Sequence, residues 1–266
     1  MRNAAQKHKF EEMRKTLCAI LLILSAFSAY SWGKVGHQMV AEIAKVYVSK
    51  AVQDSVNKYL DGLTWEDAAT WMDDVRGEAK YKYMSHWHYV NVEKDKTYVA
   101  GPDAENCVAI INRSVGELAG KAKLTHEQIN MDLKLLFHLV GDEHMPLHVG
   151  YGEDKGGNTI EVNYFNKMVK LHHLWDSDII HSHLAEIQKE LTALCKAATK
   201  EEIRKMQGGE AVEWMNEGRT YLPQVYDFKD YTISKEYDQK AVALIEKQIF
   251  TAGVRLAGIL NKAFGM

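Results

Sequence analysis

Apolar residues recur along most of this chain with the 3.6-residue period of an amphipathic helix. The longest such pattern covers residues 235–263, and residues 133–140 form a shorter apolar run. Residues 159–165 instead alternate between apolar and polar side chains, which is the period of a strand. Further helices are expected over residues 35–48, 52–60, 65–75, 107–119, 130–140, 171–194 and 201–220. The pattern predicts an all-α fold, a single compact domain with one small β hairpin.

The first 31 residues have the pattern of a secretory signal peptide. Arg14 and Lys15 precede an apolar run over residues 17–29, and the last residue of the run, Ala29, forms with Tyr30 and Ser31 the small-x-small pattern that signal peptidase accepts. The run is too short to form a stable membrane anchor. Cleavage after Ser31 would make Trp32 the first residue of a secreted or periplasmic protein.

The folded domain is therefore expected over residues 32–266, and Met13 is an alternative start that would make residues 1–12 an upstream extension. Residues 1–31 hold five of the 33 basic and two of the 36 acidic residues, so the remainder has a net charge of −6. A protein that binds nucleic acid through general surface charge is usually basic. A nucleic-acid site here would need locally concentrated positive charge, which bound metal can supply.

Two cysteines, Cys107 and Cys195, remain after cleavage, and neither belongs to a Cys-x-x-Cys motif. In an oxidising compartment they form one disulfide or stay as two buried thiols, and the sequence favours neither.

The first candidate for chemistry follows the apolar stretch at residues 133–140. His138 and Asp142 are four residues apart, so on a helix both side chains share one face. Pro146 ends the helix and turns His148 toward a neighbouring position. A neutral imidazole and a carboxylate on one face suit a divalent metal, although a buried histidine bonded to an acid gives the same pattern.

The same spacing recurs at His172 and Asp176, which strengthens the metal interpretation. Asp73 stands beside an aromatic residue, and two histidines, His86 and His88, lie close together in an aromatic segment. His37 follows Trp32 by five residues, and a free α-amino group with its own carbonyl oxygen could chelate a metal beside that imidazole.

Six motifs then occur in one order between residues 32 and 176: Trp-Gly-x-x-Gly-His, Ala-x-Trp-x-Asp, His-Tyr-Val-Asn, His-x3-Asp-x-His-x-Pro-Leu-His, Gly-Gly-Asn and Leu-His-x-x-Trp-Asp. In this order they resemble the single-strand-specific zinc nuclease and 3′-nucleotidase family, the S1/P1 nucleases. The resemblance implies a helical domain of the zinc phospholipase C and nuclease type around three zinc ions. It implies one zinc on Asp73, His88, His138 and Asp142, a second on the amino and carbonyl groups of Trp32 with His37 and Asp142, and a third on His148, His172 and Asp176.

The resemblance also implies the reaction. A hydroxide bridging two zinc ions would attack phosphorus in single-stranded DNA, RNA or a 3′-nucleotide, and the third zinc would stabilise the departing 3′-oxygen. Arg76 matches a family arginine that neutralises the developing charge. No protein partner is implied. The products would be 5′-nucleotides.

Substrate contacts are implied less specifically. Tyr89 stands where the family places an aromatic that stacks on a base, Asn91 where many members carry Asp, and Asn158 is a third candidate. Tyr89 packed in the core and Asn91 in a turn are the simpler alternatives. The remaining histidines are expected outside the metal centre: His86, His126, His144, His173, His181 and His183.

The nearest alternative enzyme is zinc-dependent phospholipase C. Its members also begin with Trp but place the first His further along, and their last ligand pair contains Glu, whereas here the last acid is Asp176. A non-enzymatic protein with a structural zinc site is disfavoured because such sites are usually closed by thiolates.

Overall fold

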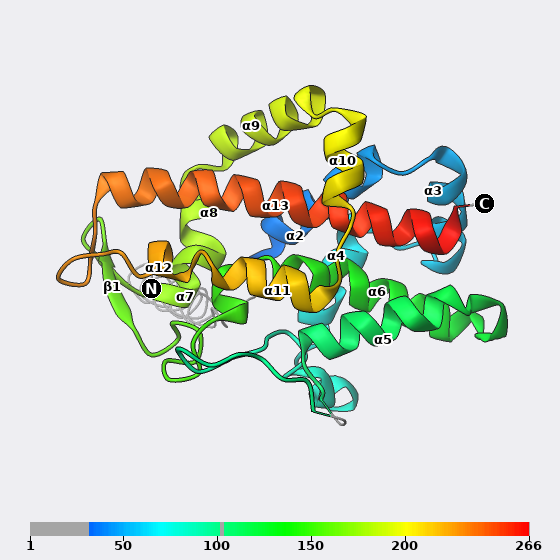
Figure 1. The fold of residues 1–266 in the computed structure, drawn as a ribbon, viewed down its shortest axis with the longest axis horizontal. Coiled ribbons are helices and arrows are strands. Elements are labelled where there is room, and N and C mark those ends of the chain that lie inside the picture. The colour runs from blue at the N-terminus through cyan, green and yellow to red at the C-terminus, as the bar shows by residue number, and fades with distance from the viewer. Residues whose placement is uncertain (1–31, 102–103, 266) are drawn as a thin grey trace, which may run out of the picture.

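The computed structural model describes residues 32–101 and 104–265, so the predicted signal peptide lies outside the described residues. Helix α13 (Lys235–Phe264) runs the length of the molecule in Figure 1, with the small sheet near one end and helix α3 near the other. The all-α prediction is confirmed. The other long helices are α2 (Lys34–Val46), α3 (Lys50–Tyr59), α4 (Trp65–Asp74), α5 (Cys107–Ala119), α6 (His126–Glu143) and α9 (Leu184–Ala197).

Helix α6 forms the centre of the domain. Thr125 caps it by accepting from the Gln128 backbone N–H, and the Gln128 side chain accepts from the Thr125 backbone in return. The helix contacts α2, α3, α4, α5, α11 and α13, and it is buried on nearly all sides from Ile129 onward. It ends before Pro146, which begins the 3-10 turn η3 (Pro146–Val149).

Helix α13 packs closely on α2. A Cβ added at Gly253 would lie 2.5 Å from Ile43 Cβ, so only glycine permits this approach of the two helices. Ser234 caps the first turn of α13 by accepting from the Tyr237 backbone N–H. The α2 and α13 contact fixes the start of the domain against its last helix.

The predicted hairpin is present but belongs to a three-stranded sheet. Strands β1 (Glu161–Tyr164) and β2 (Lys167–Lys170) are antiparallel, and both residues of their turn, Phe165 and Asn166, have positive φ. Strand β3 (Thr232–Ile233) adds to β1 in parallel. The predicted hairpin is confirmed, and the third strand was not predicted because two residues are too few to show a strand period.

Two predicted helices are interrupted. Residues 171–194 contain α7 (Leu171–His173), the π-helical turn η4 (Leu174–Asp178) and α8 (Ile179–Ser182), and α9 begins only after His183. His183 leaves the helix and its Nε2 lies 2.8 Å from Asp238 on α13. The second interrupted helix is the one predicted over residues 201–220. It breaks at Gly209, whose φ of +87° no other residue adopts easily. The remaining elements are η1 (Ala79–Met84), η2 (Lys121–Lys123), α10 (Lys200–Met206), α11 (Ala211–Arg219) and α12 (Leu222–Val225).

Both cysteines are free thiols, Cys107 buried and Cys195 half-buried. Of the two possibilities that the sequence left open, the structure therefore has no disulfide between them. Among residues 32–101 and 104–265, no helix is both long enough and apolar enough to cross a membrane.

Candidate metal centre

The predicted metal ligands come from separate elements and meet inside the domain. Helix α6 supplies two of them, α2 and α4 supply one each, and the others lie in the turn after η1, in η3 and in residues 171–176. All are at least 92% buried. Their exposed fractions are His37 0%, Asp73 8%, His88 4%, His138 0%, Asp142 0%, His148 3%, His172 7% and Asp176 0%.

Asp142 lies at the centre of the first group. Its Oδ1 is 3.3 Å from His37 Nε2, and its Oδ2 is 3.0 Å from His88 Nδ1 and 3.2 Å from His138 Nε2. Asp73 Oδ1 lies 3.9 Å from His138 Nε2. Two overlapping sets therefore have the spacing of a metal site, one of His88, His138 and Asp142 and one of His37, Asp73 and His138.

A second group lies beside the first. His148 Nε2 is 3.9 Å from Asp176 Oδ1, and His172 Nε2 is 3.8 Å from Asp176 Oδ2. His148 Nδ1 is also 3.7 Å from Asp142 Oδ1, so Asp142 connects the two groups. The structure thus brings together all eight side chains that the sequence suggested as ligands.

Backbone carbonyls fix the orientation of three imidazoles. The Nδ1 atoms of His138, His148 and His172 each lie 2.7 Å from a carbonyl oxygen, those of Ala69, His88 and Gly156 in turn. This leaves each Nε2 directed at the carboxylates. Such a partner on the far nitrogen is the usual arrangement around a metal-bound histidine.

Gly141 allows the amino-terminal ligands to reach Asp142. A Cβ at Gly141 would lie 2.7 Å from His37 Nδ1 and 3.7 Å from Trp32 Cδ1, so both residues pack against this point of α6. The Gly33 N–H also donates to the Asp176 carbonyl at 2.7 Å. The start of the described chain is therefore attached to both groups.

The pKa values of Asp142 and Asp176 are shifted in opposite directions. Burial acts to raise the pKa of Asp142, but His138 and His148 outweigh it and hold the pKa well below its ordinary value. Burial together with the charges of Asp142 and Asp73 raises the pKa of Asp176 well above its ordinary value. Asp142 is thus ionised in the folded protein, whereas the negative charge of Asp176 is not sufficiently compensated by its neighbours.

The pKa values of the histidines are also shifted in opposite directions, upward for His138 and downward for His148 and His172. Burial acts to lower the pKa of His138, but Asp142 and Asp73 outweigh it and raise that pKa to about 9. Burial lowers the pKa of His148 to about 3 and lowers that of His172 as well. These last two imidazoles are therefore neutral near pH 7, the form that binds metal.

These residues fit zinc. A tetrahedral site with bonds of about 2.0–2.1 Å separates its ligand atoms by about 3.3–3.4 Å, near the spacings found here. Several buried polar atoms also have no hydrogen-bond partner among the described residues: Asp73 Oδ1, His148 Nε2 and both carboxylate oxygens of Asp176. Bound cations would compensate these atoms, and His and Asp donors without thiolate are typical of catalytic zinc.

A cleft of about 490 Å³ opens onto this centre from one side. His88, His148 and His172 form its inner wall. The residues that the sequence suggested for substrate contact all line it: Arg76, Tyr89, Asn91 and Asn158. Tyr89 is 39% exposed, so the alternative of a core tyrosine is wrong.

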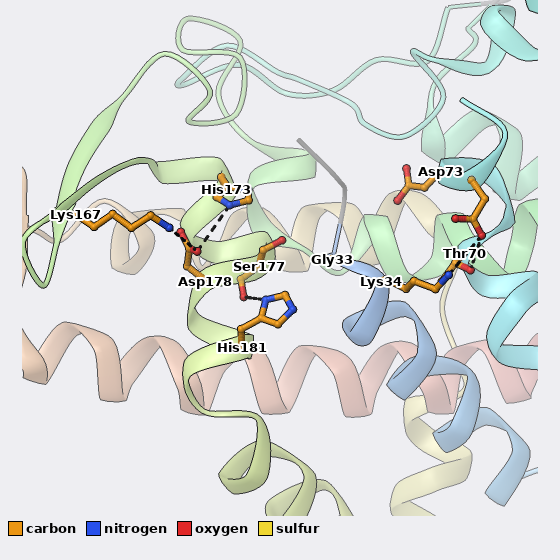
Figure 2. A pocket seen from close by; sticks show the side chains of 10 residues that line it. Gly33, Lys34, Thr70, Asp73, Lys167, His173, Ser177, Asp178 and His181 are labelled. Carbon is orange, nitrogen blue, oxygen red and sulfur yellow. Dashed lines mark hydrogen bonds and ion pairs between the residues drawn. The ribbon is translucent and has the colours of Figure 1, made fainter. Parts of the chain in front are cut away.

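A second cleft of about 560 Å³ opens on another side of Asp73 (Figure 2). Its two lysines are paired with acids, Lys34 with Asp74 at 3.8 Å and Lys167 with Asp178 at 3.4 Å. This cleft therefore offers little uncompensated positive charge to an anionic ligand.

The histidines expected outside the centre lie outside it. His86, His126 and His183 pair with acids at or near the surface, and His144 lies 2.8 Å from Arg255. Gly141 and Lys155 were not predicted from the sequence, and Lys155 also lines the cleft of about 490 Å³. A glycine inside a helix between two ligands, and a lysine directly before Gly-Gly-Asn, were the available signals.

A helical domain with a buried His and Asp centre, two neutral imidazoles at His148 and His172 and a polar cleft is typical of the class of metal-dependent hydrolases. Comparison with known families shows that residues 32–265 match the S1/P1 nuclease model, and the chain belongs to this family, whose members hydrolyse phosphodiester bonds.

Individual relatives agree with this assignment. Endonuclease 2 of Arabidopsis thaliana is 29% identical over 280 residues, which cover 94% of this chain and 96% of that protein. Nuclease S1 of Aspergillus oryzae is 25% identical over 263 residues, 87% of this chain and 91% of that protein. Nuclease P1 of Penicillium citrinum is 27% identical over 160 residues, 55% of this chain and 57% of that protein.

Proposed function

We propose that this protein is a zinc-dependent nuclease that hydrolyses single-stranded DNA and RNA to 5′-nucleotides and removes phosphate from 3′-nucleotides. The observation that carries the proposal is Asp142. Its two oxygens are shared among three imidazoles and lie next to a second His and Asp group. Such an arrangement is suited to holding several metal ions side by side at one phosphate.

Three zinc ions would be held as follows. Asp73, His88, His138 and Asp142 hold one, the Trp32 amino and carbonyl groups with His37 and Asp142 hold a second, and His148, His172 and Asp176 hold the third. Bound zinc lowers the pKa of water toward about 7 and neutralises negative charge on phosphate.

The protein side chains position the substrate. Tyr89 presents an exposed ring in the cleft, on which a nucleobase can stack. Stacking requires a base that is free of its duplex partner, which explains a preference for single strands. The stacked nucleoside places its 3′-oxygen toward His148 and His172, because these histidines line the same cleft.

Arg76 is the cation for the phosphate. It lies one turn of chain after Asp73, lines the cleft and is close enough to Asp176 for its charge to oppose, without reversing, the rise in that residue's pKa. A guanidinium can bind two phosphate oxygens at once and stabilise the charge that develops as the ester bond breaks.

Secretion completes the proposal. The α-amino group of Trp32 becomes a ligand only when residues 1–31 are removed, so cleavage would both release and activate the enzyme. A precursor that retains these residues should contain one zinc fewer and have little activity; a fully active precursor would contradict this step.

The direct test compares three substrates with and without a chelator. Release of nucleotides from single-stranded DNA and of phosphate from 3′-AMP is expected, and both should stop when zinc is removed. Phosphatidylcholine should remain intact, whereas its cleavage would favour the phospholipase C alternative. Absence of chelator-sensitive hydrolysis of the two nucleic-acid substrates would refute the proposal.

A further inference from the structure

The loop over residues 152–158 closes one side of the base cleft and carries Lys155. Asp154 holds the loop with both carboxylate oxygens, accepting from the Gly157 N–H at 2.8 Å and from the Tyr226 hydroxyl at 2.7 Å. The Lys155 N–H donates to the Gly152 carbonyl at 3.2 Å. These bonds fix the backbone of the loop, and they place the Lys155 backbone at the rim of the cleft.

The backbone of Lys155 is in the left-handed region, with φ 56°. For a residue with a side chain this conformation costs about 1–2 kcal/mol, and asparagine or glycine would adopt it more easily. The Lys155 carbonyl accepts from Asn158 Nδ2 at 2.9 Å, which helps to hold the strained backbone. A lysine at such a position is better explained by its ammonium group than by the needs of the turn.

That ammonium group has no competing acid. Of the residues that line this cleft none is Asp or Glu, and among the described residues no carboxylate pairs with Lys155. Lys34 and Lys167 in the second cleft differ, since each is paired with an aspartate (Figure 2). Lys155 therefore offers three N–H donors and no acceptor to whatever enters the base cleft.

Asn91 lies beside the loop and supplies an acceptor. Tyr89 and Asn91 are two residues apart in an extended segment held by hydrogen bonds from Val90 N to His148 O and from Val92 N to Gly150 O, so both face the cleft. Asn91 Oδ1 is buried without a hydrogen-bond partner among the described residues, and it lies 3.3 Å from the Cβ position of Gly156, the residue after Lys155. Rotation of the Asn91 amide away from Gly156 would present this acceptor, beside the Lys155 ammonium, to the edge of a base stacked on Tyr89.

We infer that Lys155, with Asn91 beside it, makes the base cleft select bases that carry a carbonyl next to a ring N–H: guanine, hypoxanthine, uracil and thymine. Lys155 donates to the carbonyl, as lysine does at guanine O6 in other nucleic-acid complexes, and Asn91 Oδ1 accepts from the ring N–H. Adenine and cytosine present an amino group and an unprotonated ring nitrogen in the opposite order. Because an ammonium cannot accept, Lys155 decides the preference while the Asn91 amide alone could rotate.

The inference rests on the proposed nuclease function, and its test uses three 3′-nucleotides with purine bases of similar stacking area: 3′-GMP, 3′-IMP and 3′-AMP. Hypoxanthine keeps the guanine carbonyl and ring N–H but lacks the 2-amino group. The ratio of kcat/KM for 3′-IMP over 3′-AMP should be about fivefold, the lower end for one good base contact, because Lys155 is exposed. The ratio for 3′-GMP over 3′-AMP should be similar.

Substitutions of Lys155 then test whether this residue causes the base preference that the kcat/KM ratios measure. Lys155→Met keeps most of the length and loses the charge, and it should bring both ratios close to one. Lys155→Arg should keep the preference, since arginine makes the same contact. Lys167→Met is the matched control in the second cleft and should leave both ratios unchanged. Zinc content and the thermal unfolding midpoint of each variant verify that the fold and metal centre are intact.

Two results would overturn the inference. One is a wild-type ratio near one, and the other is a Lys155→Met variant that loses the same factor on all three nucleotides, which would make Lys155 a phosphate contact. If no nucleotide is hydrolysed, the proposed function fails, and calorimetric binding of inosine against adenosine still tests the base preference. Equal dissociation constants for the two nucleosides would then refute it.

Discussion

Replacing Asp176 by Asn should change the stability of the metal-free and the zinc-loaded protein in opposite directions. Asp176 is fully buried, and neither carboxylate oxygen has a hydrogen-bond partner among the described residues. The adjacent imidazoles of His148 and His172 are neutral because burial lowers their pKa values. Without metal, the folded protein must therefore hold either an uncompensated carboxylate or a protonated one.

The magnitude follows from the pKa of Asp176, which is raised well above its ordinary 3.8. A raised pKa of an acid costs stability as pH increases from the unfolded value to the folded one, at about 1.4 kcal/mol for each pH unit. At pH 7 the cost is at most about 4 kcal/mol, the limit set by protonating the group. The asparagine introduced by Asp176→Asn is neutral and of the same size, so the metal-free variant should gain about 2–4 kcal/mol, or about 5–10 °C in Tm.

Thermal unfolding, measured once with excess chelator and once with zinc, gives the sign of the change in Tm in each metal state. The metal-free gain should be present at pH 7, shrink as pH falls toward 4 and vanish below about pH 3, where Asp176 is protonated in both the folded and the unfolded state. With zinc, the variant should unfold below the wild type and contain one zinc fewer. Asp178→Asn is the matched control, since Asp178 pairs with Lys167 and should shift Tm equally in both conditions. A Tm change of the same sign in both metal states for Asp176→Asn would refute the reasoning.

Four further outcomes are expected. Asp142→Ala should remove two of three zinc ions by elemental analysis and abolish hydrolysis; a variant with full zinc content would contradict the shared ligand. Gly141→Ala should remove one zinc, because its Cβ would lie 2.7 Å from His37 Nδ1, whereas Gly116→Ala, with nothing within 4 Å, should keep all zinc and gain about 1 kcal/mol. Zinc binding at pH 7 should release at least one proton, since the pKa of His138 is about 9 in the metal-free protein, and titration calorimetry in buffers of different ionisation enthalpy measures it. The stabilisation from this protonated histidine is full below pH 6.5 and is lost as pH rises through about 9, so metal-free Tm should fall over that range.

Much of the ligand set was predictable because helical spacing alone brings two pairs together. His138 with Asp142 and His172 with Asp176 are each four residues apart, and both pairs meet in the structure. Periodicity could not choose between His86 and His88 or between Asp73 and Asp74. The resemblance to the S1/P1 nucleases indicated His88 and Asp73, and the structure places both residues at the buried centre.

Other features depend on contacts between distant parts of the chain. The π-helical turn that carries Asp176 has four successive buried residues, which no helical period predicts. The break at His183 depends on Asp238 of α13, far along the sequence. The position of Lys155 depends on Tyr226, which reaches Asp154 from the end of α12.

The two halves of the metal centre therefore differ in how they depend on metal. Asp142 already has three imidazoles within 3.3 Å, and its pKa is held low, so the protein itself compensates this charge. Asp176 has neutral histidines 3.8–3.9 Å away and no hydrogen bond among the described residues, and the charge of Arg76 does not offset its burial. Removing the negative charge of Asp142 would leave protonated His138 in the core with only the more distant Asp73 carboxylate, 3.9 Å away, whereas removing that of Asp176 leaves no buried cation without its nearest counter-charge. This asymmetry is why a stabilised metal-free variant is expected from Asp176 and not from Asp142.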